Sequence, residues 1–88
     1  MHFSGNQLRA ARALLGQDQD EFAAALGIGI NTLRTMEASG AEMVGGFAST
    51  RERVTRALEK IGIELLNDGV PGVRLHKPAK KAKAKRTL

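Results

Sequence analysis

The chain has 88 residues and a formal net charge of +5 at pH 7, a length that allows one domain with a small core. Because it contains no cysteine, and its two histidines stand near opposite ends at positions 2 and 76, the composition excludes disulfides and thiolate chemistry and argues against a histidine-based cluster. No apolar run approaches the roughly 20 residues that span a bilayer, and the start lacks the layout of a signal peptide, so we expect a soluble, cytoplasmic protein.

The first predicted helix covers roughly residues 5–15. Ser4 and Gln7 have the spacing of a capping box, in which each side chain accepts a hydrogen bond from the other residue's backbone N–H. Gly16 provides the stop, because glycine tolerates the left-handed conformation at a helix end. The apolar residues between them recur at helical spacing and are Leu8, Ala11 and Leu15.

Two short helices are predicted within residues 18–37. Asp18 and Glu21 repeat the capping-box spacing, and Gly27 ends the first of the two after about eight or nine residues. Gly29 stands at the N-cap of the other, which runs to about Glu37. Small and apolar side chains allow the two helices to pack closely around a sharp turn: Ala23, Ile28, Leu33 and Met36. This segment predicts a helix-turn-helix, whose second helix can enter the major groove of DNA.

A loop and a fourth helix follow. Residues 38–48 contain three glycines and no periodicity, which predicts a loop, and its apolar members are expected to fold back on the core: Met43, Val44 and Phe47. Ser49 and Glu52 predict a third capping box. The helix that it opens carries an apolar stripe of Val54, Leu58 and Ile61 and stops at Gly62.

The segments 63–66 (IELL) and 73–75 (VRL) are mostly apolar and flank the turn-forming pairs Asp-Gly and Pro-Gly. This arrangement favours a small β-hairpin, and a helical turn through 63–66 is the alternative.

Residues 76–88 are predicted to form a disordered, lysine-rich tail. Six of the 14 basic residues and none of the nine acidic ones lie in 77–88, so residues 1–76 hold eight basic and nine acidic residues and balance at −1. The tail is therefore either a solubilising terminus or an additional electrostatic hold on nucleic acid. Its candidate DNA contacts are Lys80, Lys81, Lys83, Lys85 and Arg86.

Residues 4–75 resemble the Cro/phage-repressor type helix-turn-helix regulators, the xenobiotic-response-element (XRE) family of bacteria. The matching pattern comprises Leu8, Arg9 and Arg12 in the first helix, Gln19, Phe22 and Ala23 in the second, Gly27 and Ile28 at the turn, and Leu33, Met36 and Glu37 in the third. The resemblance implies an all-α, compact four- to five-helix domain over residues 1–75 that ends in a short β-hairpin or extended segment. It further implies a nucleoid-associated transcriptional regulator, such as a repressor, that binds double-stranded operator DNA as a homodimer.

The same resemblance implies roles for individual residues. Base edges would be read by Ile30, Asn31 and Thr35, with Ile30 placed to contact a thymine methyl group. Phosphates would be bound by Gln19, Thr32 and Arg34, and Arg51 of the fourth helix is a further candidate. Arg12 is expected to pair with Glu37. The alternative is that these side chains do not bind DNA and only belong to a polar first turn and to solvent-exposed helix faces.

Two classes of function fit the sequence. The first is the sequence-specific DNA-binding regulator, and the second is a small antitoxin or anti-activator whose helix-turn-helix serves autoregulation. The second class predicts an exposed apolar surface on the 38–48 loop or on the hairpin, kept for a protein partner. An enzyme is not expected, because the chain lacks a matched nucleophile and base or a pair of catalytic carboxylates. We expect neither a cofactor nor a metal.

Overall fold

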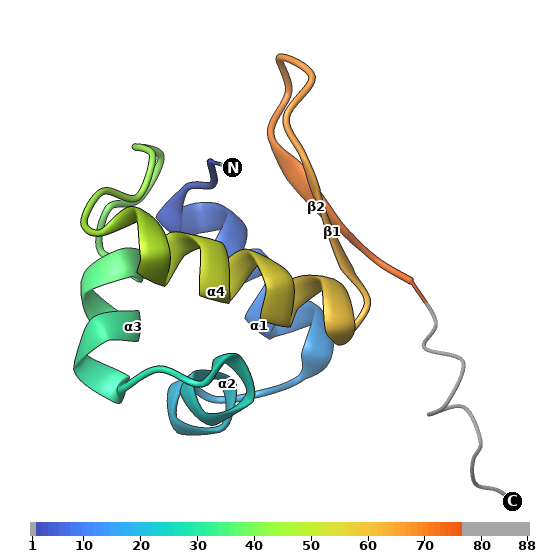
Figure 1. The fold of residues 1–88 in the computed structure, drawn as a ribbon. Helices are drawn as coiled ribbons and strands as arrows, with labels where there is room; N and C mark the ends of the chain where they lie inside the picture. Colours follow the sequence, from blue (N-terminus) through green and yellow to red (C-terminus); the bar gives the residue numbers. More distant parts are fainter. Residues whose placement is uncertain (1, 77–88) are drawn as a thin grey trace, which may run out of the picture.

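The computed structural model describes residues 2–76. Of the tail predicted over 76–88, His76 is described, and its backbone N–H donates to the Gly62 carbonyl at 2.7 Å; the other tail residues lie outside the described ones. Four helices are followed by a two-stranded antiparallel sheet, in the order α1 (Gly5–Leu15), α2 (Gln19–Leu26), α3 (Ile30–Glu37), α4 (Ala48–Lys60), β1 (Ile63–Leu66) and β2 (Gly72–Leu75). Figure 1 shows the helices as one cluster, with the hairpin rising beside α1 and the end of α4. The fold is mostly helical, and 63–66 forms a strand rather than a helical turn.

The first two helices begin at the capping boxes that the sequence predicts. The Gln7 backbone N–H donates to Ser4 Oγ at 3.1 Å, and the Ser4 N–H donates to Gln7 Oε1 at 2.9 Å. Asp18 and Glu21 make the equivalent pair of hydrogen bonds at 2.8 and 2.9 Å. Both helices end at a glycine with positive φ, which a residue with a Cβ rarely adopts.

The predicted capping box at Ser49 and Glu52 is wrong. Helix α4 begins at Ala48, two residues before the start that an N-cap at Ser49 implies, so Ser49 lies inside the first turn instead of before it. Phe47 occupies the N-cap position and makes no side-chain cap. The Glu52 carboxylate pairs instead with Arg56 one turn later, at 3.3 Å.

Only one apolar residue of the 38–48 loop folds back on the core. The Val44 N–H donates to the Phe3 carbonyl at 2.8 Å, and Met43 forms a β-bridge with Ser4. Because successive side chains of such extended backbone point to opposite sides, Val44 is buried while Met43 is 50% exposed. Phe47 is 81% exposed. The expectation that Met43 and Phe47 join the core is therefore wrong.

The core lies between all four helices. Its largest fully buried side chains are Phe3, Leu8, Phe22, Leu26, Leu33, Val54 and Leu58. Helix α1 crosses the end of α3 so closely that a Cβ on Gly5 would lie 2.5 Å from the carbonyl oxygens of Met36 and Glu37. The lack of a side chain at Gly5 thus sets the distance between the start of α1 and the end of α3.

A buried glutamine fixes the hairpin to α1. The Gln7 Nε2 donates to the carbonyl oxygens of Leu66 and Gly72 at 3.1 and 2.9 Å, and to Asn67 Oδ1 at 3.2 Å. Leu66 and Gly72 are partners at the end of the β1–β2 register. The hairpin therefore leaves the helices in one defined direction, although two-stranded hairpins alone are marginally stable.

Candidate nucleic-acid interface

Helix α3 presents a polar outer face. Asn31, Thr32, Arg34 and Thr35 are exposed, whereas Leu33, Met36 and Glu37 are buried. Ile30 is half-buried and packs against the core, so only part of its side chain is open to a ligand. The structure thus brings the expected base-reading residues to one side of a helix, with Ile30 at its inner border.

The turn between α2 and α3 is short and well determined. Gly27 has φ of +72°, and the next residue, Ile28, donates its N–H to the Ala23 carbonyl at 3.0 Å. Ala23 is buried at the contact between the two helices. No side chain caps the start of α3 within residues 2–76, because Gly29 stands at its N-cap.

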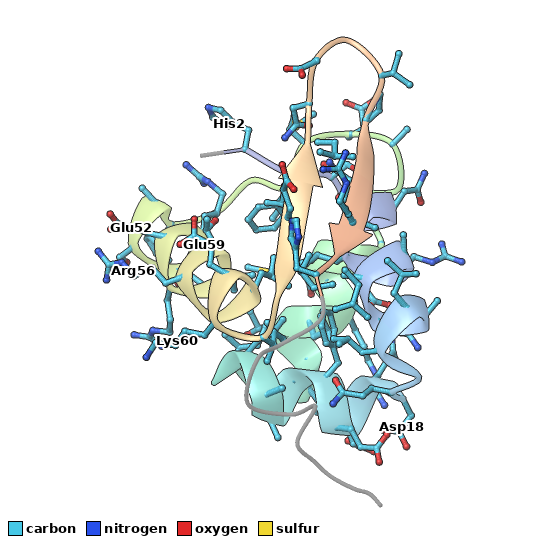
Figure 2. All side chains as sticks on the ribbon, turned by 90° about the vertical axis from the view of Figure 1, so that its right-hand side faces the viewer. His2, Asp18, Glu52, Arg56, Glu59 and Lys60 are labelled. Atoms are coloured by element: carbon cyan, nitrogen blue, oxygen red, sulfur yellow. The ribbon has the colours of Figure 1, made fainter. Side chains whose placement is uncertain are left out.

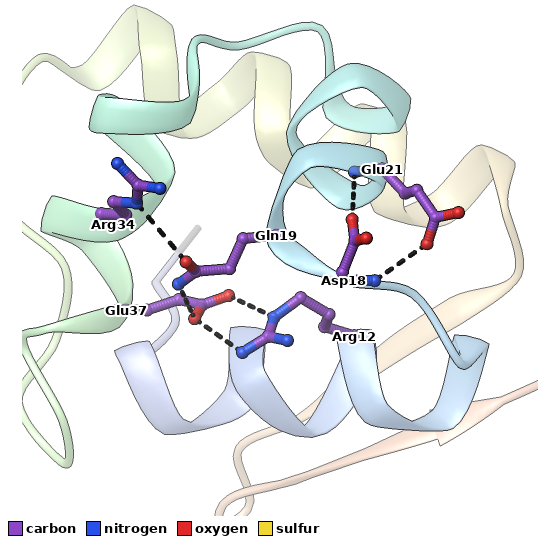
Figure 3. Close-up of polar contacts among 6 residues, drawn as sticks. All are labelled: Arg12, Asp18, Gln19, Glu21, Arg34 and Glu37. Atoms are coloured by element: carbon purple, nitrogen blue, oxygen red, sulfur yellow. Dashed lines mark hydrogen bonds and ion pairs between the residues drawn. The ribbon is translucent and has the colours of Figure 1, made fainter.

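A polar network built on Glu37 joins α1, α2 and α3, as Figure 3 shows. The Arg12 guanidinium donates twice to the Glu37 carboxylate, at 2.9 and 3.0 Å. The Gln19 side-chain amide donates to the same carboxylate at 3.0 Å. The hydrogen bond to Glu37, together with the charges of Glu37 and Asp18, raises the pKa of Arg12 further above its ordinary value despite partial burial. Since Glu37 is buried, these three hydrogen bonds replace the water that it has lost.

Within this network the Gln19 side chain, expected to bind phosphate, contacts protein groups. Its amide nitrogen is bound to Glu37, and its oxygen lies 3.5 Å from Arg34 Nε, a long contact. The N–H of Glu21 in the same first turn is bound by Asp18. With Asp20, the start of α2 carries three acidic side chains, which repel a phosphate. In this structure a side chain therefore already occupies one N–H of the first turn of α2, and the carboxylates around it make this end of the helix less favourable for an anion.

Of the other expected phosphate contacts, Thr32 and Arg34 are exposed on α3. Arg51 is half-buried, and its Nη1 donates to the Gly46 carbonyl at 2.6 Å. Arg51 therefore closes the loop before α4, and its remaining guanidinium N–H groups are still able to donate.

A groove separates α3 from the loop and first turn that open α4. It has a volume of about 350 Å³, and its lining residues are Asn31, Thr32, Thr35, Met36, Gly45, Gly46, Phe47 and Thr50. Sequence reasoning missed the part that the loop plays here, because it assigned Phe47 to the core. None of these lining residues, all from the described part of the chain, is acidic.

Other cations lie on α4, away from this groove. Arg53, Arg56 and Lys60 border a second hollow between α4 and α2, and Figure 2 shows Arg56 and Lys60 projecting outward from the helix. Arg56 is paired with Glu52. Arg53, Arg56 and Lys60 are all exposed and form a solvated, basic part of the α4 surface.

Residues 2–76 contain no group of three or more side chains suited to hold a metal ion. Within the same residues, no helix combines the length and the apolar character that crossing a membrane requires. Comparison of the chain with protein-family models, with curated proteins and with solved structures found no match.

Proposed function

We propose that this protein is a sequence-specific DNA-binding transcriptional regulator of the Cro/repressor-like helix-turn-helix type. The observation that carries the proposal is the exposed polar face of α3 on a helix pair held by the core and by the Glu37 network. A base-reading helix must keep a fixed orientation, since hydrogen bonds to base edges depend on side-chain direction. The Glu37 network supports this, because it joins α3 to both preceding helices.

Asn31 and Thr35 are the proposed base-reading residues. An asparagine side chain can bind adenine through two hydrogen bonds, and a threonine hydroxyl can bind several base edges. Thr32 and Arg34 lie on the same exposed face and are proposed to bind the flanking phosphates. Gln19 is proposed as a further phosphate contact, since its amide donates one N–H to Glu37 and has a second N–H able to donate.

The regulator is proposed to act as a homodimer. An eight-residue helix reads only a few base pairs, and a two-fold dimer doubles the contact on half-sites one helical turn apart. The hairpin is the proposed dimer element, since its strands have open edges and Val70 near its tip is 79% exposed. Sedimentation of the free protein and of its DNA complex tests this, and a monomer in both states contradicts it.

The central experiment selects duplexes from a random library and compares the preferred site with a scrambled one. Asn31→Ala and Thr35→Ala should each lower the affinity ratio of the two sites by roughly 5- to 150-fold, which corresponds to about 1–3 kcal/mol. Asn6→Ala, an exposed asparagine on α1, is the matched control and should leave the ratio unchanged. Thermal unfolding should be unaltered in all three variants. If the wild-type chain prefers no sequence, the proposal is wrong.

One observation favours a second candidate, the antitoxin or anti-activator module. Phe47 and Met43 are 81% and 50% exposed in the 38–48 loop, and an exposed apolar surface there is what a protein-binding role predicts. The two candidates differ in one measurable respect. A regulator discriminates DNA sequences as an isolated chain, whereas an interaction module needs its partner to show its main activity.

A further inference from the structure

The three phenylalanines of the chain have opposite environments. Phe3 and Phe22 are completely buried, whereas Phe47 is 81% exposed. Leaving a phenylalanine in water forgoes the favourable free energy that burying its ring would provide. In a domain with so small a core, an aromatic side chain that does not contribute to it is available for contact with a ligand.

The backbone of Phe47 is held firmly. Its carbonyl oxygen accepts hydrogen bonds from the N–H groups of Thr50 and Arg51, at 3.1 and 3.2 Å. The preceding carbonyl, that of Gly46, is bound by the Arg51 guanidinium at 2.6 Å. Phe47 is therefore presented from a fixed turn at the start of α4, which lowers the entropy lost on binding.

The side of the molecule on which Phe47 lies is the side that carries the proposed base-reading residues. Phe47 lines one wall of the 350 Å³ groove, and Asn31 and Thr35 line the other. The surroundings suit a polyanion: the described lining holds no carboxylate, and no side chain caps the first turn of α4. The uncapped N–H groups of that turn carry partial positive charge. The charge of these surroundings therefore favours DNA, a polyanion, over a basic protein segment.

We propose that Phe47 is a specificity-determining residue that contacts a thymine C5-methyl group at the edge of the site read by α3. The methyl group of thymine is the one apolar feature of the major groove, and phenylalanine is among the side chains that read it. This inference rests on the proposed function. It adds to α3 a second reading element, in the loop before α4.

The experiment uses the full chain and the duplex selected above. Each thymine of the site is replaced in turn by deoxyuridine, which lacks only the C5-methyl group, and binding is measured for wild type and Phe47→Ala. At one thymine of each half-site, wild type should bind deoxyuridine about 4-fold more weakly, the equivalent of ~0.8 kcal/mol for one apolar carbon. Phe47→Ala should bind the thymine site more weakly and show no further loss with deoxyuridine. Phe47→Leu should retain part of the methyl effect.

Leu14→Ala is the matched control, since Leu14 is another large, exposed apolar side chain but lies on α1 and does not line the groove. It should behave as wild type on every duplex, and both alanine variants should unfold at the wild-type temperature. A methyl effect that persists in Phe47→Ala assigns the thymine to another side chain, such as Ile30, and overturns the inference. Equal weakening of Phe47→Ala on selected and scrambled duplexes overturns it too. If the wild-type chain shows no sequence preference at all, the proposed function is contradicted. That result is distinct from the two outcomes that overturn only the role of Phe47.

Discussion

Glu37 is the residue on which the orientation of α3 depends. Its carboxylate is 5% exposed and accepts hydrogen bonds from α1 and α2, while its own backbone belongs to the last turn of α3. A buried charge without partners is strongly unfavourable, so the arrangement is stable only while the donors are present. One carboxylate thus joins three helices.

Removing the arginine should therefore cost more than a surface ion pair does. Arg12→Ala leaves the Glu37 carboxylate with the Gln19 amide alone, and we expect it to lower the free energy of unfolding by about 2 kcal/mol. The control is Arg9→Ala, an exposed arginine on the same helix, for which we expect a change within about 0.5 kcal/mol. Urea unfolding measures both. If Arg12→Ala and Arg9→Ala lower the free energy of unfolding equally, the Arg12–Glu37 ion pair contributes no more than a solvent-exposed ion pair does.

At the scale of elements, the contact between α1 and α3 depends on a missing side chain. A methyl group on Gly5 would meet two backbone carbonyls at 2.5 Å, and backbone cannot move aside as a flexible side chain can. We expect Gly5→Ala to destabilise the protein by about 2–3 kcal/mol, as overpacking does. Gly45→Ala, where nothing lies within 4 Å of the added carbon, should change stability by less than about 0.5 kcal/mol. The unfolding temperatures of both variants, measured against that of the wild-type protein, test this difference.

The hairpin should respond to acid. The hydrogen bond from His76, 2.6 Å from Glu64, and the charge of Arg74 lower the pKa of the Glu64 carboxyl below its usual 4.5. A lowered pKa in the folded state means that the pair stabilises the hairpin above pH 4.5 and that this contribution is lost as the pH falls through the lowered value. The protection of β1 and β2 amides against hydrogen exchange, taken relative to the intrinsic exchange rate at each pH, should therefore decrease as the pH falls below 4.5. Glu64→Gln should remove this pH dependence. If the variant keeps it, a group other than Glu64 is responsible.

Sequence reasoning predicted the elements whose signals are local. The boxes at Ser4 and Asp18 and the glycine stops fix α1 and α2 through contacts within four residues along the chain. The same logic failed at Ser49, because the start of α4 is determined by the turn that Arg51 closes on Gly46. The exposure of Phe47 and the use of Gln19 by Glu37 depend on neighbours distant in sequence. Local patterns therefore give the helices, whereas the availability of a side chain for a ligand depends on tertiary packing.

At the scale of the whole molecule, charge is divided between the domain and its C-terminal extension. Residues 1–76 balance at −1, and residues 77–88 carry six basic side chains and no acidic one. Within the domain, acidic side chains gather at the start of α2, where they do not favour DNA. The domain alone thus offers hydrogen-bond donors on α3 but no net positive charge, so in the proposed regulator the long-range attraction to DNA is expected to come from the extension.

Truncation after His76 should consequently reduce affinity and leave specificity intact. Lysine and arginine contacts with phosphates carry no direct sequence information, while the proposed base-reading residues all remain in the truncated chain. Each phosphate contact contributes about 0.9 to the slope of log K against log salt, so the loss of three or four contacts should reduce that slope by about 3. A salt titration of both chains on selected and scrambled duplexes measures the two quantities together. The two affinities should fall by similar factors, and their ratio should stay the same. An unchanged slope would mean that the basic residues of the extension do not contact DNA and serve solubility alone.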